Sequence, residues 1–268
     1  MTNNKANSKN TTTTPSEESF VKFVDVHKSF GDFTVFDGLN LNILKGKINF
    51  VVGRSGSGKS VMLKHILGFL QPDRGDIFIE NKNTKLFNTK DWQKTRKKVG
   101  MLFQDSALFD SMSVFENVAF PIREHTKKSE KEIKELVSQK LSLVGLDKHH
   151  KKLPAELSGG MRKRVALSRA IALNPDLVLF DEPSSGLDPI VSSVVDKLIL
   201  DIHSNLKSTF LIISHDMKGT LKIAHRVSML YDGKLVFNGT SQELTNTTNP
   251  LVKQFVHGRL DGPFNIFY

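Results

Sequence analysis

Apolar positions along the chain alternate between short continuous runs and longer stretches with helical spacing. The run Leu177–Phe180 is apolar at every position, which is typical of a parallel strand covered on both faces. In Ser129–Val144, a capping pair of Ser129 and Glu132 precedes apolar residues that share one helical face. The two patterns together predict an α/β fold. Strands are predicted at Phe20–Val26, Ile48–Val52, Ile77–Glu80, Lys98–Phe103, Leu177–Phe180 and Phe210–Ser214, with a hairpin at Val227–Phe237 across Asp232-Gly233.

The same pattern divides the chain into three parts. Residues 1–19, rich in Asn, Thr, Ser and Lys, predict a disordered polar tail. Residues 20–239 carry the strands and helices and predict one domain, with an inserted helical subdomain at about 105–173. Residues 240–268 form a C-terminal extension that opens with a second capping pair, Thr240 and Glu243.

Composition narrows the class of protein. The chain has 268 residues, 38% of them hydrophobic, which is enough to bury a sizeable core. It contains no cysteine, which excludes disulfides, thiolate metal ligands and cysteine nucleophiles and suits a reducing compartment. No apolar run approaches the ~18 residues that span a membrane, and the N-terminus lacks an apolar signal segment. We therefore expect a soluble intracellular protein.

The net charge of +10 is modest for this length. Positive charge gathers at Lys94–Lys98, Lys127–Lys134 and Lys148–Lys152. Such runs usually lie on a solvated surface, and an anionic membrane surface or a nucleic acid are the alternatives, in that order. We expect no nucleic-acid partner.

A phosphate-binding loop is the most specific motif. Gly53-Arg54-Ser55-Gly56-Ser57-Gly58-Lys59-Ser60 matches the pattern G-x-x-x-x-G-K-[ST] between a predicted strand and a helix at Ser60–Leu70. The glycines let backbone N–H groups and the helix N-terminus surround a phosphate. Lys59 is expected to reach the β- and γ-phosphates of a nucleotide, and the Ser60 hydroxyl to ligate Mg²⁺.

Two carboxylates follow the apolar strand Leu177–Phe180. Asp181 is suited to hold Mg²⁺, directly or through water, and Glu182 to polarise the water that attacks the γ-phosphorus. Because a strand often ends in a surface acid, this pattern alone is weak evidence for a metal or catalytic site. Together with the phosphate-binding loop it becomes strong evidence.

A second anion-binding helix start is predicted at Leu157-Ser158-Gly159-Gly160-Met161, before a basic helix at Arg162–Leu173. A simple serine-capped turn is the alternative. Because one nucleotide needs one phosphate-binding loop, a second anion site suggests a nucleotide shared between two copies of the chain.

Three further residues are candidates for the same site. Gln104 and His215 each follow a predicted strand, at the strand end where ligands bind in open α/β sheets. Gln104 could contact the metal and the γ-phosphate. Phe30 could stack on an adenine ring, although a place in the core is the more common role of a phenylalanine.

These motifs in this order resemble the ATP-binding domain of ATP-binding cassette (ABC) ATPases from about Phe20 to Gly239. The resemblance makes Gly53–Ser60 the Walker A loop and Leu177–Glu182 the Walker B strand. It makes Gln104 the Q-loop residue, Leu157–Met161 the signature, Ser185–Pro189 the D-loop and His215 the H-loop residue. It implies a P-loop NTPase with a RecA-like mixed sheet, an antiparallel β subdomain and an inserted helical subdomain. Its cofactors would be ATP and Mg²⁺.

The resemblance also implies a head-to-tail dimer. Ser158, Gly159 and Gly160 of one copy would cap the γ-phosphate held by Lys59 of the other, while His215 contacts that phosphate and Asp188 couples the two sites. Met161 departs from the glutamine of most members. The residues expected to touch phosphate are intact, so we expect hydrolysis to survive.

The signature with Met161, the segment Val114–His125 and the late Asp261-Gly262-Pro263 are similar to ATP-binding subunits of MCE-associated (Mla-type) phospholipid transporters. That subfamily implies a peripheral subunit at the cytoplasmic face of the inner membrane. Its partners would be an integral membrane permease, an MCE-domain lipid-binding protein and a small regulatory subunit. A socket for the permease would be formed by Leu108, Phe109, Met112, Phe115 and Phe120, and subdomain core is the alternative role of these residues.

Three other functions remain open at this point. The chain could drive another ABC transporter with a different small-molecule substrate. It could be a soluble DNA- or translation-associated ABC ATPase, but it has one cassette, no cysteine and no long heptad run. A regulatory binder without hydrolysis would lack Glu182 or His215, and both are present.

Overall fold

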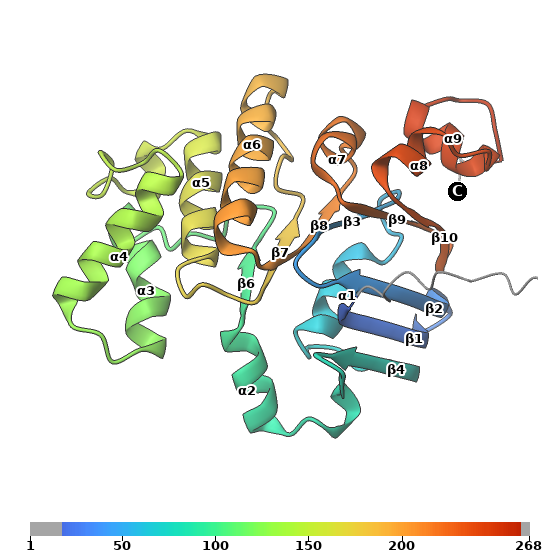
Figure 1. The fold of residues 1–268 in the computed structure, drawn as a ribbon, viewed down its shortest axis with the longest axis horizontal. Helices are drawn as coiled ribbons and strands as arrows, with labels where there is room; N and C mark the ends of the chain where they lie inside the picture. The colour runs from blue at the N-terminus through green and yellow to red at the C-terminus, as the bar shows by residue number, and fades with distance from the viewer. Residues whose placement is uncertain (1–17, 264–268) are drawn as a thin grey trace, which may run out of the picture.

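A computed structural model describes residues 18–263, which form two sheets with helices packed around them (Figure 1). The larger sheet has six strands in the order β10-β9-β3-β8-β7-β6, and the smaller has four in the order β2-β1-β4-β5. The larger sheet is mixed: its pairs are parallel except β9–β10, whereas the smaller sheet is antiparallel. The predicted α/β class, with a mixed sheet and an antiparallel β subdomain, is confirmed.

The strands of the larger sheet are β3 (Ile48–Val52), β6 (Val99–Leu102), β7 (Leu177–Asp181), β8 (Thr209–Ser214), β9 (Arg226–Tyr231) and β10 (Lys234–Gly239). Those of the smaller sheet are β1 (Ser19–Phe30), β2 (Phe33–Leu44), β4 (Arg74–Ile79) and β5 (Lys82–Asn83). The helices are α1 (Lys59–Ile66), α2 (Thr89–Lys97), α3 (Val114–His125), α4 (Glu130–Leu143), α5 (Gly159–Ala170), α6 (Pro189–Leu206), α7 (Met217–Ile223), α8 (Ser241–Thr245) and α9 (Pro250–His257), with short 3-10 turns at Thr84–Leu86 and Pro154–Glu156.

The central strands are buried on both faces, as the continuous apolar runs predict. Leu177 and Leu179 of β7 belong to the core shared with α1 and the smaller sheet. Val178 and Phe180 belong to the opposite core, which the helices of the inserted region cover. The alternation fixes the register of β7, since a slip by one residue would exchange the two faces.

Helices α3, α4 and α5 lie together at one end of the molecule (Figure 1). The predicted start of α4 is confirmed: Ser129 Oγ accepts from the Glu132 N–H, and the Glu132 carboxylate accepts from the Ser129 N–H. A buried Asn117 holds the loop before α3, because its side-chain amide bonds the Phe109 N–H and the carbonyls of Phe109, Met112 and Ser113.

Some predicted boundaries are wrong. Strand β2 was not predicted, because Gly38 interrupts its apolar pattern at a bulge where φ is +72°. Helix α1 ends at Ile66 instead of Leu70, since the chain turns at Gly68 with φ +70° beneath the Trp92 ring. Helix α5 was predicted at Arg162–Leu173 but runs from Gly159 to Ala170, so each end lies three residues earlier. It begins earlier because Ser158 caps the helix directly.

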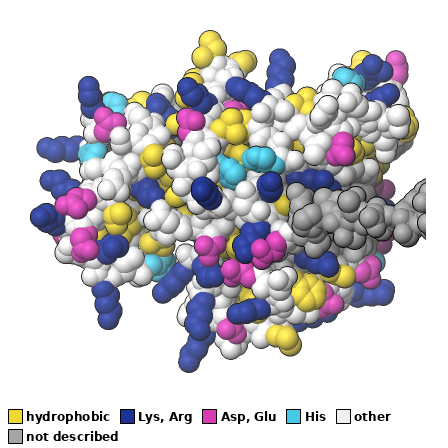
Figure 2. Space-filling model, in the orientation of Figure 1, with side chains coloured by type: hydrophobic (Ala, Val, Ile, Leu, Met, Phe, Trp, Pro, Cys, Tyr) yellow, Lys and Arg dark blue, Asp and Glu magenta, His cyan; other side chains and the backbone are white. Residues whose placement is uncertain are grey.

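Within residues 18–263, no helix is both long and apolar enough to cross a membrane. The lysines of the three basic runs are mostly exposed, and on the face seen in Figure 2 the lysine and arginine side chains are scattered rather than gathered into one patch. The predicted tail at 1–19 lies almost wholly outside the described residues, as does the end of the extension at 264–268.

A direct backbone contact between β6 and α5 gives a prediction about stability. A Cβ at Gly100 would lie 2.1 Å from the Ala170 carbonyl oxygen, and backbone cannot rotate out of the way as a side chain can. We expect Gly100→Ala to lower the free energy of unfolding by about 2 kcal/mol or more. Urea unfolding followed by circular dichroism measures this. A loss below about 0.5 kcal/mol, the usual scatter of surface substitutions, would contradict the packing.

Candidate functional site

A cavity of about 700 Å³ lies at the C-terminal ends of the parallel strands. Parallel strands direct these ends to one edge of the sheet, where ligands bind in open α/β folds. Among the predicted site residues, the cavity is lined by Phe30, Ser55, Gly56, Gly58, Lys59, Ser60, Gln104, Asp181, Glu182 and His215. The structure thus brings together residues that are up to 185 positions apart in the sequence.

The loop between β3 and α1 forms one wall, and two of its glycines are required by close contacts. At Gly53, with φ +153°, a Cβ would lie 2.4 Å from the Leu230 carbonyl oxygen. At Gly58, with φ +91°, it would lie 2.6 Å from Val35 Cγ1. Arg54, Ser55 and Ser57 also border an adjoining hollow of about 350 Å³. The buried Ser57 Oγ has no hydrogen-bond partner among the described residues.

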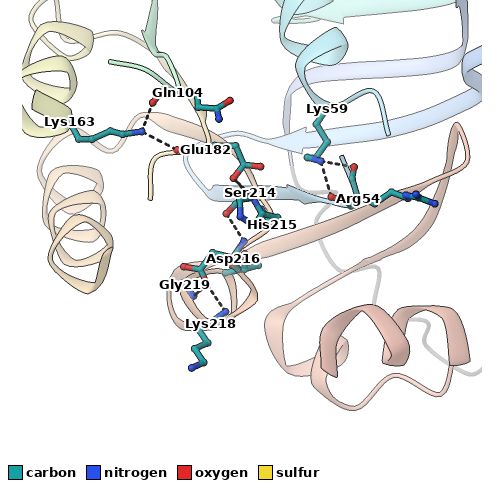
Figure 3. Close-up of polar contacts among 12 residues, drawn as sticks. Arg54, Lys59, Gln104, Lys163, Glu182, Ser214, His215, Asp216, Lys218 and Gly219 are labelled. Carbon is teal, nitrogen blue, oxygen red and sulfur yellow. Dashed lines mark hydrogen bonds and ion pairs between the residues drawn. The ribbon is translucent and has the colours of Figure 1, made fainter. Parts of the chain in front are cut away.

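Lys59 is buried at the first turn of α1. Its Nζ donates to the carbonyls of Gly53 (2.8 Å) and Arg54 (2.9 Å), as Figure 3 shows. Burial lowers the pKa of Lys59, and the nearby Glu182 and Asp181 partly oppose that shift. The hydrogen-bond partners of the ammonium are therefore backbone carbonyls, which hold it in the loop beside the cavity.

Asp181 ends strand β7 and lies beside Ser60, whose side chain hydrogen-bonds to it. Burial and the adjacent Glu182 raise the pKa of Asp181, while Lys59 and the Ser60 bond oppose the shift. The described part of the chain contains no cluster of three or more His, Asp or Glu that could hold a metal by itself. Ser60 and Asp181 instead offer two oxygen ligands, which fits a hard cation such as Mg²⁺ that takes its other ligands from phosphates and water.

Glu182 is fixed by several neighbours. His215 Nδ1 lies 2.8 Å from its Oε2, and the His215 N–H donates to the same oxygen at 3.3 Å. The Glu182 N–H donates to the Ile213 carbonyl at 3.0 Å. The Glu182 backbone has φ +51°, a left-handed conformation that is uncommon outside glycine. The glutamate side chain is largely buried whereas the His215 ring is 66% exposed.

The signature residues do not line this cavity. Ser158 caps α5 and accepts from the Met161 N–H at 3.3 Å. Asp188 caps α6 in the same way, accepting from the Ile190 N–H at 2.9 Å. A Cβ at Gly160 would lie 2.6 Å from Val191 Cγ1, so the start of α5 packs against the start of α6.

Sequence analysis did not single out the cavity-lining Phe33, Val35, Val61 and Ile213, nor Lys163 beside the cavity. Phe33 lines the cavity beside Phe30 and is 61% exposed. Lys163 of α5 is buried, and its Nζ donates to the carbonyls of Gln104 and Glu182. Burial lowers the pKa of Lys163, with Asp105, Glu182 and Asp181 opposing. Within a basic helix, the sequence gives no sign that one lysine is buried against backbone carbonyls.

Comparison with known proteins defines the class of this protein. Residues 36–185, more than half of the chain, match the family model described as ABC transporter. The chain therefore belongs to the ABC transporter family, and it is an ATP-binding, ATP-hydrolysing member of it.

Individual relatives are similar over most of the chain. It is 44% identical over 238 residues to the intermembrane phospholipid transport system ATP-binding protein MlaF of Haemophilus influenzae, covering 89% of this chain and 90% of MlaF. It is 43% identical over 239 residues to the probable ribonucleotide transport ATP-binding protein mkl of Mycobacterium leprae, covering 89% and 69%. Among solved structures, the dimeric post-hydrolysis state of the ATP-binding cassette MJ0796 bound to ADP and Pi gives a TM-score of 0.74 at 29% identity, over 82% of this chain and 98% of that one.

The position of Lys59 gives a prediction about binding. We expect Lys59→Ala to weaken ATP binding about tenfold or more, because the loop loses its charge-assisted hydrogen bonds to phosphate. Isothermal titration calorimetry measures the affinity, and thermal unfolding without nucleotide checks that the variant is folded. An affinity within about twofold of the parent would contradict this reading of Lys59.

Proposed function

We propose that this chain is the ATP-hydrolysing motor subunit of a transporter that moves phospholipid between two membranes. The similarity to MlaF carries the proposal, since it extends over nine-tenths of both chains. Two copies would act as a head-to-tail dimer at the cytoplasmic face of the inner membrane. They would work with an integral membrane permease, an MCE-domain lipid-binding protein and a small regulatory subunit.

Each residue of the cavity takes a role that its surroundings support. Lys59 would exchange its two carbonyl partners for the β- and γ-phosphates. Glu182 would polarise the attacking water, since its carboxylate faces the cavity and is oriented by His215. His215 would contact the γ-phosphate, and Phe30 would stack on the adenine.

Mg²⁺ fits the oxygens that the site offers. Ser60 and Asp181 would hold the ion, with the Gln104 side chain beside it. Bound there, Mg²⁺ would neutralise charge on the β- and γ-phosphates. Partial burial and the adjacent Glu182 raise the pKa of Asp181, and in such a setting a divalent cation favours the ionised form.

The dimer is supported by the place of the signature. Ser158, Gly159 and Gly160 do not line the cavity of their own copy, and we expect them to meet the phosphate held by another copy. The first backbone N–H groups of α5 have no partner within the helix, as at any helix start, and suit an anion. The solved MJ0796 cassette is itself a dimer.

The role of Glu182 gives a prediction about turnover. We expect Glu182→Gln to bind ATP with the parental affinity but to hydrolyse it ~100-fold more slowly or worse, because an amide cannot accept a proton from water. The bound ATP would then trap the dimer. A coupled phosphate assay and size-exclusion chromatography with ATP measure both effects. Parental turnover would refute the role of Glu182, and a monomer that hydrolyses ATP at the full rate would refute the shared site.

A groove of about 300 Å³ between β6, α3 and α5 supports a permease contact. Of the five predicted socket residues, Phe109 and Phe120 line it, with ring centroids 5.0 Å apart. Leu108 and Phe115 instead pack against the helical core, and Met112 does not line the groove. Phe103 is an addition to the predicted set.

The charges around the groove suggest the chemistry of its partner. Arg96, Lys97, His125 and Arg169 line it together with the exposed phenylalanines, and none of its lining residues is acidic. An apolar helix that carries a carboxylate would therefore fit the groove better than a basic one.

Phe109 gives a prediction about assembly. We expect Phe109→Asp to lose the permease in affinity purification from detergent-solubilised membranes, because the new carboxylate replaces an apolar contact and pairs with Arg169, which lies 5.7 Å over the ring. ATP binding should be unchanged. Leu86→Asp is the matched control, since Leu86 is 82% exposed and lies outside the groove. Retention of the permease by Phe109→Asp would contradict the socket.

The same purification with the parent chain tests the substrate. Mass spectrometry of the eluate that finds a permease, an MCE-domain protein and bound phospholipid would support the proposal. A permease that co-purifies with another cargo would support the role as a transporter ATPase but contradict phospholipid as the substrate. The relative mkl is named for ribonucleotide transport, so another cargo is a specific alternative. The absence of any membrane partner would favour a soluble ABC ATPase.

A further inference from the structure

Lys163 joins the signature helix to the catalytic edge of the sheet in the same chain. It lies five residues after Ser158 on α5 and is 7% exposed. Its Nζ donates to the carbonyl of Gln104 and, at 3.3 Å, to that of Glu182 (Figure 3). These two carbonyls follow the neighbouring parallel strands β6 and β7. No ion pair of the described residues includes Lys163, so its direct hydrogen-bond partners are backbone dipoles.

The Glu182 backbone needs support from its surroundings. A residue with a Cβ stays at φ +51° only where its neighbours hold it there. The Glu182 N–H is held by the Ile213 carbonyl at 3.0 Å, and its carbonyl is held by Lys163. Because the two groups flank Cα, they fix the direction in which the carboxylate leaves the backbone.

Helix α5 holds the segment after Gln104 at a second point. Arg169 donates to the carbonyls of Ser106 (2.9 Å) and Ala107 (2.7 Å), which both have positive φ angles of +64° and +46°. The amide side chain of Gln104 extends on the other side of the backbone from Lys163 (Figure 3). The carbonyl is thus anchored to α5 while the amide remains available to the cavity.

We infer that Lys163 is a positioning residue for ATP hydrolysis. Its ammonium sets the orientation of the Glu182 carboxylate and of the Gln104 amide without lining the nucleotide cavity. The inference rests on the proposed role of Glu182. It also implies that a shift of the Gln104 segment moves α5, and with it the signature that would serve the other copy.

Lys163→Met tests this inference in the full-length chain, since methionine keeps much of the length and removes the ammonium. We expect kcat to fall about tenfold or more while KM and the equilibrium affinity for ATP stay within about threefold. Lys163→Arg should restore kcat to within about threefold, because a guanidinium offers paired donors for two carbonyls. Lys163→Gln keeps one donor group, so its kcat should lie between those of the methionine and arginine variants. It replaces the methionine variant in the test if that variant does not fold.

Lys140→Met is the matched control. Lys140 is likewise buried in the helical region, but its Nζ donates to Asn174 Oδ1 at 2.6 Å, away from the cavity. We expect this variant to keep the parental kcat. A loss of kcat in both methionine variants, a matching rise in KM, or no recovery with arginine would overturn the inference in favour of a general structural role.

Glu182→Gln in the same assay separates the two proposals. Parental turnover by Lys163→Met with an inactive Glu182→Gln would overturn the role of Lys163 alone. Parental turnover by Glu182→Gln would overturn the proposed function of Glu182 on which the inference rests.

Discussion

Two buried ammonium groups flank the acids of the cavity, and both bind peptide carbonyls instead of carboxylates. Lys59 bonds the loop of Gly53, and Lys163 bonds the strand ends at Gln104 and Glu182. A carbonyl is a dipole, so neither ammonium is neutralised by a carboxylate of its own, and the raised pKa of Asp181 reflects burial beside Glu182. The cavity therefore keeps separate positive and negative groups. Of the two ammonium groups, only Lys59 lines the cavity and can meet a phosphate, whereas Asp181 and Glu182 can meet a cation or a water molecule.

This separation depends on the parallel strands. Asp181 of β7 is in register with Ile213 of β8, whose carbonyl accepts from the Glu182 N–H. The register is fixed because β7 and β8 are buried on both faces, where a slip would place residues in the wrong core. The apolar packing of β7 and β8 thus fixes the positions of the polar groups at the ends of these strands.

The sequence predicted the parts of this arrangement that are contiguous. The loop at Gly53–Ser60 requires glycine at fixed positions, and helix α4 shows its cap and its face within 16 residues, so both could be read directly. Strand β2 was missed because a bulge breaks its pattern at Gly38. Lys163 was missed for a different reason: its partners are backbone groups, which every residue has, and only the fold brings them within reach.

One copy of the chain holds both parts of the proposed composite site, but at separate places. Ser158 accepts from the Met161 N–H, which leaves its hydroxyl hydrogen and the first N–H groups of α5 without partners inside the helix. Gly160 packs closely on the Val191 side chain, with no room for a Cβ, so the starts of α5 and α6 are in contact. In the proposed dimer, a phosphate at the start of α5 would therefore lie near the start of α6, which Asp188 caps. Lys163 of the same helix also hydrogen-bonds to the Glu182 backbone. Helix α5 therefore connects the surface that would meet the second copy with Glu182, the acid that would activate water.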